Sequence, residues 1–277
     1  MKIAAIQMVS TADVQANLAE AGQLLARAAA QGAEMAVLPE YFCLLGLKDT
    51  DKLKIAEQVG QGPLQEFLSS NAQTLGIWIV GGTVPLLPEP AERAEQVFPG
   101  ARIYNSTLVY GPLGQCIARY DKIHLFRFDN GKECYDESRV LLSGAQPVAF
   151  DLPSSDGHSY RIGLSICYDL RFPELYRALK ADLLLVPSAF TYTTGQAHWE
   201  PLLRARAIEN LAYVLAAAQG GTHQNGRRTW GHSMVIDPWG QIVALKAEGS
   251  GVVMAEVMAS RLNADRTRLP ALGHGVL

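Results

Sequence analysis

Short apolar runs and longer amphipathic stretches alternate along the first half of the chain. Residues 3–9 form an apolar run typical of a buried strand. Residues 13–33 follow with helical periodicity, and Gly32 supplies a helix stop near the end of this stretch. The order then continues with a predicted strand, helix and strand at residues 35–42, 62–76 and 77–87. Such alternation of strands and helices predicts a layered α/β fold.

The second half of the chain repeats this order. Strand, helix, strand, helix and strand are predicted at residues 160–167, 172–181, 182–190, 198–210 and 212–219. Each half also contains a predicted hairpin, at residues 102–125 with a turn at "GPLGQ" and at residues 231–246 with a turn at "DPWG". Residues 127–148 are polar and irregular, which is typical of a functional loop.

The repeated order predicts a single domain over residues 1–277. The strands are nearly continuous apolar runs, which indicates sheets buried on both faces. No Gly-, Ser- or Pro-rich linker separates the two halves. The expected fold class is therefore α/β, with two sheets facing each other and helices on the outside.

Composition narrows the class of protein. The chain is 48% hydrophobic and 18% charged with a net charge of −3, so it lacks the basic excess typical of nucleic-acid binding. No apolar run approaches the roughly 20 residues that span a bilayer. The apolar patch at the N-terminus is interrupted by Gln7 and Ser10 before it reaches the length of a secretion signal. We therefore expect a cytoplasmic protein that binds neither nucleic acid nor membranes.

The cysteines indicate reduced thiols. There are four of them, at positions 43, 116, 134 and 167, in a long chain without a signal peptide. No two cysteines are closely spaced, and the six histidines form neither an HxxH nor an HxxxH motif. The sequence therefore predicts no metal site.

Three polar or ionisable side chains lie at the ends of predicted apolar strands. Glu40 ends "MAVLPE", Lys122 lies in "YDKIHL", and Cys167 ends "RIGLSIC". In α/β proteins, functional side chains gather at strand ends because the scaffold holds them rigidly. Each has an ordinary alternative: Glu40 and Lys122 as solvated charges, and Cys167 as a small apolar side chain.

The chemistry of a thiol explains why these three residue types belong together. A thiol with a pKa near 8.5 needs a base, and a nearby carboxylate can take its proton. Attack of the thiolate on a carbonyl or nitrile carbon creates negative charge. A lysine ammonium and a backbone N–H at a helix start can stabilise that charge.

Three ordered segments carry a resemblance to a known family. "LPEYF", "YDKIHLF" and "ICYDLRFPELYR" are similar to the signature segments of the nitrilase superfamily, the carbon–nitrogen hydrolases. The similarity runs from Met1 to about Pro270. It implies a four-layer αββα sandwich, no cofactor, and Glu40, Lys122 and Cys167 as catalytic residues.

The same resemblance implies a second functional glutamate. The segment "YDESRVLLSG" is similar to a loop that carries this residue in many members, which places it at Glu137; the alternative is a solvated loop charge. The family commonly forms dimers, so the resemblance also implies a homodimer.

The branch of the superfamily is indicated by "AHWEPLLRARAIENLAYVLAAAQGG" and "GHSMVIDPWG". Both are most similar to the nitrilase-like branch that includes deaminated glutathione amidase, and the ω-amidases share much of this pattern. The loop "LFRFDNGKECYDES" departs from the form typical of either branch. The expected reaction is hydrolysis of a primary amide of a small carboxylate-bearing molecule to an acid and ammonia through a cysteine thioester. The alternatives are an ω-amidase acting on α-ketoglutaramate and a nitrilase or aliphatic amidase.

Four further residues are candidates for substrate binding. The backbone N–H of Tyr168 is a candidate oxyanion donor. Arg171 lies four residues after Cys167, one turn along a helix that starts there, and its planar fork suits a substrate carboxylate; the alternative is a salt bridge to a neighbouring acid. Phe190 and Thr194 are candidates for the pocket wall.

Two functions of other classes remain open at this point. A papain-like Cys/His hydrolase would use one of the histidines, although no local signature for it is found. A non-catalytic binding or scaffold protein on the same fold is the other.

Overall fold

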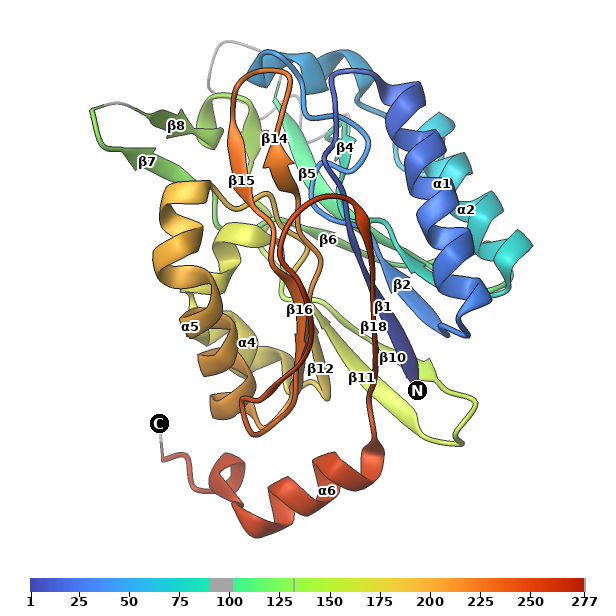
Figure 1. Cartoon of the computed structure of the whole chain (residues 1–277), viewed down its shortest axis with the longest axis vertical. Helices are drawn as coiled ribbons and strands as arrows, with labels where there is room; N and C mark the ends of the chain where they lie inside the picture. Colours follow the sequence, from blue (N-terminus) through green and yellow to red (C-terminus); the bar gives the residue numbers. More distant parts are fainter. Residues whose placement is uncertain (90–101, 132, 277) are drawn as a thin grey trace.

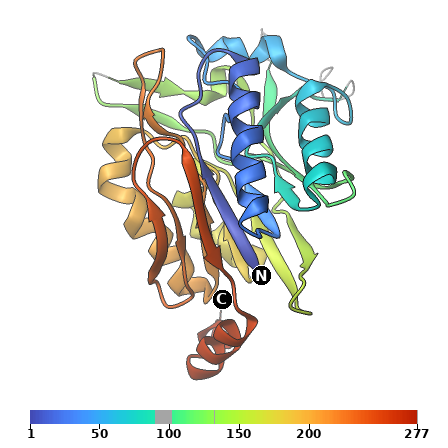
Figure 2. The same cartoon turned by 45° about the vertical axis from the view of Figure 1, so that its right-hand side comes forward.

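Two β-sheets stack face to face at the centre of the molecule, and helices cover their outer faces (Figure 1). The computed structural model describes residues 1–89, 102–131 and 133–276. Helices α1 and α2 lie on one side of the stacked sheets, and α4 and α5 lie on the other. The view in Figure 2 shows α1 and α2 side by side over their sheet.

The first sheet has eight strands. Its main path runs β18-β1-β2-β3-β5-β4, and β6 and β9 also pair with β5. Strands β1, β2 and β3 are parallel to one another, whereas β18 pairs with β1 in the antiparallel sense. The bounds are β1 Lys2–Gln7, β2 Met35–Val37, β3 Trp78–Val80, β4 Val84–Leu86, β5 Ile103–Tyr110, β6 Cys116–Asp121, β9 Leu141–Leu142 and β18 Gly251–Glu256.

The second sheet has six strands in the order β10-β11-β12-β13-β16-β17. Strands β11, β12 and β13 are parallel, as are the three central strands of the first sheet. Two small hairpins, β7–β8 and β14–β15, stand apart from both sheets. The bounds are β7 Arg127–Asp129, β8 Cys134–Asp136, β10 Ala149–Pro153, β11 Ser159–Leu164, β12 Leu183–Leu185, β13 Tyr213–Ala216, β14 Gly220–Thr222, β15 Arg228–Trp230, β16 Ser233–Ile236 and β17 Ile242–Lys246.

The helices follow the amphipathic stretches of the sequence. Helix α1 begins after Asp13, whose carboxylate accepts hydrogen bonds from two backbone N–H groups of the first turn. Helix α2 ends at Gly76, which adopts the left-handed conformation that glycine permits. The bounds are α1 Val14–Ala30, α2 Pro63–Leu75, α4 Pro173–Leu179, α5 Tyr192–Asn210 and α6 Ala259–Arg268, with short 3₁₀ helices η1 Asp49–Ile55, η2 Glu137–Arg139, η3 Cys167–Arg171 and η4 Ala271–Gly273.

Side chains point to alternate faces of each strand, so one strand contributes to two hydrophobic clusters, one between the sheets and one beneath the helices. In β1, Ile3 and Ala5 pack into the same buried cluster as residues of the second sheet, whereas Ala4 and Ile6 pack with α1 and α2. Every one of these four side chains is fully buried. Sheets with two apolar faces require cover on both sides, and the αββα sandwich predicted from the sequence is confirmed.

Some predicted elements differ from the structure. The strand predicted at 77–87 is interrupted at Gly81 and Gly82 and forms β3 and β4. Residues 127–148 are more ordered than predicted, since they form β7, β8, η2 and β9; residue 132 of this loop lies outside the described residues. Helix α5 begins at Tyr192, before the predicted start at residue 198. No helix in the part of the chain that the structure describes is long and apolar enough to cross a bilayer.

Candidate active site

Glu40 lies in the turn after β2, close to residues of both sheets. Its side chain is 1% exposed. Oε1 accepts hydrogen bonds from Asn105 Nδ2 and Lys122 Nζ, each at 2.9 Å, and Oε2 accepts one from the backbone N–H of Ala189 at 2.8 Å. Asn105 belongs to the first sheet, whereas Ala189 follows β12 of the second. Both sheets therefore hold this carboxylate in place, which excludes the solvated alternative.

Lys122 follows β6 directly and is fully buried. Its Nζ lies 2.9 Å from Oε1 of Glu40 and 2.8 Å from Oε2 of Glu137. Burial lowers the pKa of Lys122, but the negative charges of Glu137 and Glu40 outweigh it and hold this pKa well above its ordinary value. Lys122 is therefore a fixed buried cation and not a surface charge.

Cys167 opens the 3₁₀ helix η3 at the carboxyl end of β11. Its φ of 49° lies in the left-handed region, which costs a residue with a side chain about 1–3 kcal/mol. Its N–H donates to the carbonyl of Pro187 at 3.0 Å. The sharp turn that results presents the thiol at the end of the strand.

Asp169 stabilises this turn through hydrogen bonds. Its fully buried carboxylate accepts hydrogen bonds from the backbone N–H of Ile166 at 2.8 Å and from the hydroxyl of Tyr120 at 2.7 Å. It also accepts from the backbone N–H of His124 at 3.0 Å, and its Oδ1 lies 2.7 Å from Nδ1 of that ring. Because Tyr120 and His124 flank Lys122, one carboxylate fixes the lysine and cysteine segments relative to each other.

The environment of Cys167 favours the neutral thiol. Burial raises the pKa of the thiol well above its ordinary value, and the negative charge of Glu40 raises it further. The positive charge of Lys122 lowers it, but not enough to compensate. The resting side chain is thus a thiol that needs a base, and Glu40 is the carboxylate that faces it.

Glu137 lies at the start of η2 and completes the charged cluster. Besides the contacts with Lys122, its Oε1 accepts from the hydroxyl of Tyr41 at 3.0 Å and its Oε2 from the backbone N–H of Phe126 at 2.7 Å. Burial raises the pKa of Glu137, but the charge and hydrogen bonds of Lys122 outweigh it and hold this pKa below the ordinary value. Glu137 is 14% exposed, so it is not the solvated loop charge of the alternative interpretation.

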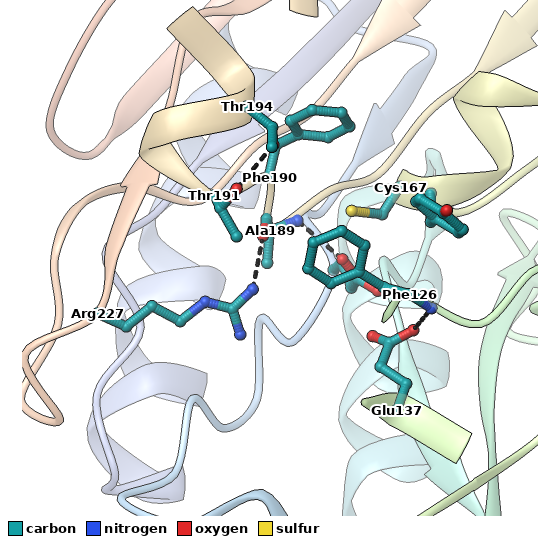
Figure 3. A pocket seen from close by; sticks show the side chains of 10 residues that line it. Phe126, Glu137, Cys167, Ala189, Phe190, Thr191, Thr194 and Arg227 are labelled. Carbon is teal, nitrogen blue, oxygen red and sulfur yellow. Dashed lines mark hydrogen bonds between the residues drawn. The ribbon is translucent and has the colours of Figure 1, made fainter. Parts of the chain in front are cut away.

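A pocket lined by Glu40, Glu137 and Cys167 opens beside the buried Lys122 (Figure 3). The Cys167 sulfur and the Arg227 guanidinium point into it from opposite sides. Aromatic side chains form much of its wall. The lining residues are Glu40, Phe126, Glu137, Cys167, Tyr168, Ala189, Phe190, Thr191, Thr194 and Arg227.

The structure brings most of the sequence candidates together at this pocket. Tyr168, Phe190 and Thr194 line it as expected. The N–H of Tyr168 lies at the start of η3, where helical N–H groups have no intrahelical acceptor.

Arg171 is placed differently from the expectation. The segment after Cys167 is a short 3₁₀ helix, so the spacing of four residues does not bring Arg171 back to the same face. Its guanidinium lies 3.3 Å from Nδ1 of His198 and over the rings of Tyr168 and Phe190, behind the pocket wall that these rings form. The neighbouring acid Asp169 is not its partner either, because its carboxylate bonds Tyr120 and His124 instead.

Sequence reasoning missed several residues of the site. Ala189 and Thr191 flank the predicted Phe190, and Phe126 ends the "YDKIHLF" segment, so all three were within reach of the pattern. Asn105 interrupts an apolar strand, which is a weak signal for a buried polar contact. Arg227 lies between β14 and β15, and no sequence signal placed this hairpin over the pocket.

All four cysteines are free, with Cys43 buried and Cys116 and Cys134 exposed. Among the described residues, no group of three or more His, Cys, Asp or Glu side chains is arranged to hold a metal ion. The chemistry available at the site is that of a thiol, a carboxylate and an ammonium group in contact.

Comparisons with known proteins agree with this geometry. The family model described as carbon–nitrogen hydrolase matches residues 2–267. A deaminated glutathione amidase from Synechocystis sp. is 41% identical over 278 residues, covering 99% of this chain and 97% of that protein.

Solved structures give the same result. The NitFhit protein of C. elegans superposes with a TM-score of 0.85 at 37% identity, covering 99% of this chain, which spans 65% of that longer chain. A variant of the amidase from Nesterenkonia sp. AN1, which shows the Michael addition of acrylamide at its active-site cysteine, has a TM-score of 0.73 at 25% identity, covering 98% of each chain.

Proposed function

Because the chain belongs to the carbon–nitrogen hydrolase family and so acts on carbon–nitrogen bonds other than peptide bonds, we propose that it hydrolyses an amide of a small carboxylate-bearing substrate through a thioester on Cys167. The observation that carries the proposal is that Glu40, which bonds the buried Lys122, lines one pocket together with Cys167.

The first half of the proposed reaction forms the thioester. Glu40 takes the proton of Cys167 as the sulfur attacks the amide carbon. Lys122 Nζ and the N–H of Tyr168 stabilise the oxyanion, a role worth about 3–4 kcal/mol per donor. Glu40 then returns the proton to the nitrogen as the carbon–nitrogen bond breaks.

The second half of the reaction regenerates the enzyme. Water enters where the leaving group was, and Glu40 takes a proton from it as its oxygen attacks the thioester carbon. The same two donors stabilise the second oxyanion, and the carbon–sulfur bond breaks as Glu40 returns the proton to the sulfur. General base assistance of this kind contributes about 10²–10⁴ in rate.

The leaving group depends on the substrate. A primary amide such as α-ketoglutaramate releases ammonia, as the sequence predicts, whereas the amide nitrogens of a glutathione-derived molecule carry a further carbon substituent and leave as an amine. A wide cavity that is open to solvent adjoins the pocket at Arg227. Relatives named deaminated glutathione amidase, 36–41% identical to this chain over nearly its full length, favour deaminated glutathione over α-ketoglutaramate, aliphatic amides and nitriles as the substrate.

The test measures the acid product, because it forms whichever leaving group departs. Purified protein is incubated with deaminated glutathione, α-ketoglutaramate, aliphatic amides and nitriles, and kcat/KM is compared. Wild type is expected to prefer the first of these substrates, and Cys167→Ala is expected to lose turnover. Cys116→Ala, at an exposed thiol on β6, is the matched control and retains it.

Two outcomes would contradict the proposal. If Cys167→Ala hydrolyses the best substrate at the wild-type rate, the thioester mechanism is wrong. If wild type converts none of the substrates, the non-catalytic binding function replaces the amidase function.

The proposal extends to a homodimer, which the resemblance to the family supports, and to a cytoplasmic location, which the interrupted apolar patch at the N-terminus favours. Light scattering of the purified protein across a concentration series tests the dimer, and a monomer mass throughout the series would contradict it. Fractionation of cells expressing the chain tests the cytoplasmic location.

A further inference from the structure

Arg227 is a cation in the pocket wall to which the mechanism above gives no role. It lies just before β15, in the connection of the β14–β15 hairpin. It lines the reaction pocket together with Cys167 and Glu40, and it also lines the wide cavity outside. In Figure 3 its guanidinium points into the pocket, facing Cys167 across the open space.

The guanidinium of Arg227 is incompletely paired. Its Nη2 donates to the carbonyl of Ala189 at 3.1 Å, and the group lies 4.9 Å from the ring centroid of Tyr135. Its Nε is buried and has no hydrogen-bond partner among the described residues. Native structures rarely leave such a buried donor without an acceptor, which a water molecule, an ion or a ligand can supply.

The nearby acids do not neutralise Arg227. Asp49 and Asp136 line an adjoining cavity with it, but no carboxylate of the described residues forms an ion pair with its guanidinium. Glu137 lines the same pocket and is paired with Lys122. Arg227 thus brings to the pocket a partly buried positive group whose buried Nε still has hydrogen-bonding capacity.

We propose that Arg227 binds the carboxylate of the substrate's acyl part and so selects anionic amides over neutral ones. This inference rests on the proposed function. A guanidinium presents N–H groups in a planar fork that matches a carboxylate. Ala189 links the two functions, because its carbonyl accepts from Arg227 while its N–H donates to Glu40. A carboxylate held at Arg227 therefore lies within a short chain's length of the reacting carbon.

Arg171, the arginine that the sequence favours for this role, is the matched control. It is partly exposed and lies behind the rings of Tyr168 and Phe190, outside the set of side chains that line the pocket. If the pocket geometry decides which arginine binds the carboxylate, Arg227 discriminates by charge and Arg171 does not.

The experiment compares two amides of equal size that differ in charge. Glutaramate carries a carboxylate at the end remote from its primary amide, and glutaramide carries a neutral carboxamide there. Arg227→Gln is expected to lower kcat/KM for glutaramate about ten- to hundredfold relative to its effect on glutaramide. Arg227→Lys, which keeps the charge but loses the fork, is expected to fall between Arg227→Gln and wild type. Arg171→Gln is expected to change both substrates by the same factor.

The ratio of the two substrates separates this role from a structural one. Loss of the bond to Ala189 would disturb Glu40 and slow both amides equally, so equal losses in Arg227→Gln would overturn the proposal. An unchanged ratio in Arg227→Gln, or a selective loss for glutaramate in Arg171→Gln, would also overturn it.

A binding measurement keeps this test independent of the proposed function. Titration calorimetry follows 2-oxoglutarate, a dicarboxylate product of the proposed reaction, into Cys167→Ala with and without Arg227→Gln. Weaker binding in the double variant by a similar factor supports the role of Arg227 even if wild type hydrolyses no amide. Equal affinity in the two variants overturns it.

Discussion

The two groups proposed for proton removal and oxyanion stabilisation at Cys167 carry charges that act on the pKa of the thiol in opposite directions. Burial and Glu40 keep the thiol protonated, whereas Lys122 favours the thiolate. The amount of thiolate at rest and the rate of turnover are therefore separate quantities.

Glu40→Gln is therefore expected to lower the pKa of the Cys167 thiol while it lowers the rate of hydrolysis. The variant removes a negative charge beside the sulfur but leaves Lys122, so the thiolate forms at lower pH. Loss of the base is expected to reduce kcat by at least about a hundredfold. Ultraviolet absorbance of the thiolate against pH, with Cys167→Ala as the blank for the other cysteines, measures the first effect. A pKa that rises in Glu40→Gln would contradict this assignment of charges.

Glu137→Gln is expected to destabilise the protein most at neutral pH. The pKa of Glu137 is lowered on folding, so its carboxylate stabilises the folded state above its ordinary pKa near 4.5, and this contribution is lost as the pH falls through the lowered value. Removal of one partner of a buried ion pair costs about 3–5 kcal/mol.

Urea unfolding at pH 7 and at successively lower pH measures this difference in the free energy of unfolding. The gap between wild type and Glu137→Gln is expected to narrow on the acid side. Glu174→Gln, at an exposed position on α4, is the control and is expected to show little change. A gap that widens in acid would mean that Glu137 is protonated in the folded protein.

At the scale of elements, the turn after β2 owes its position to a glycine on another strand connection. Gly82, between β3 and β4, has a φ of +40°, and a Cβ there would lie 2.1 Å from the carbonyl oxygen of Pro39. The residue after Glu40, Tyr41, is also in the left-handed region, with its N–H bonded to Thr83 Oγ1 at 2.9 Å. The base is thus placed by close contact between two loops.

Gly82→Ala is expected to displace the Glu40 turn. We expect a loss of about 3 kcal/mol or more in the free energy of unfolding and at least about a tenfold loss in kcat/KM. Gly60→Ala is the matched control, because Gly60 has a φ of +79° but no atom within 4 Å of the added Cβ. It isolates the backbone cost, about 1 kcal/mol. Equal stability and activity in the two variants would show that the contact with Pro39 does not position the base.

Elements with strong local periodicity were predictable, and elements defined by long-range pairing were not. Helices α1 and α2 were predicted within a few residues because the apolar period, Asp13 and Gly76 all act locally. Strand β18 has no such signal, since it is specified by its pairing with β1 at the other end of the chain. The 3₁₀ geometry of η3 was missed for the same reason: the buried Asp169 network that shapes it draws on Tyr120 and His124 from a distant segment.

At the scale of the whole molecule, β18 and α6 connect the two sheets near the C-terminus. Strand β18 belongs to the first sheet, and α6, which follows it, docks on the second through Arg266. That guanidinium bonds Asp182 at 2.6 Å and the carbonyls of Ala181 and Leu211 at 3.0 Å each. In Figure 1, α6 lies at the end of the molecule opposite the two small hairpins.

Arg266→Ala is expected to lower stability without changing catalysis. It leaves the Asp182 carboxylate without this partner, and because the pair is partly exposed we expect a cost of about 2–3 kcal/mol. Urea unfolding measures this cost, and kcat/KM is expected to stay at the wild-type value. Arg27→Ala, at an exposed arginine on α1, controls for loss of charge. A change in kcat/KM for Arg266→Ala would show that the docking of α6 is transmitted to the pocket.

The candidate site was predictable as far as its residues lay at strand ends in recognisable segments. Four separate segments of the sequence supply its charged and nucleophilic side chains, and each segment is recognisable without the structure: these residues are Glu40, Lys122, Glu137 and Cys167. The role of carboxylate binding is proposed for Arg227 and not for Arg171 because Arg227 lines the pocket, whereas Arg171 lies behind the aromatic rings of the pocket wall. Sequence spacing carries no information on that point, because the hairpin that bears Arg227 reaches the pocket only through the folded arrangement of both sheets.

The β14–β15 hairpin separates two properties that many enzymes combine in one element. The residues proposed for bond cleavage are fixed to the main sheets and the loops that continue them. Arg227 and the adjacent Arg228, which lines the outer cavity, belong to a small two-stranded hairpin. Mutations in this hairpin that keep the hydrogen bond from Arg227 to Ala189 are therefore expected to alter substrate preference while the reacting groups keep their geometry. Such a division makes the protein a favourable starting point for the evolution of new amide specificities, natural or directed, with sequence variation confined to one short segment.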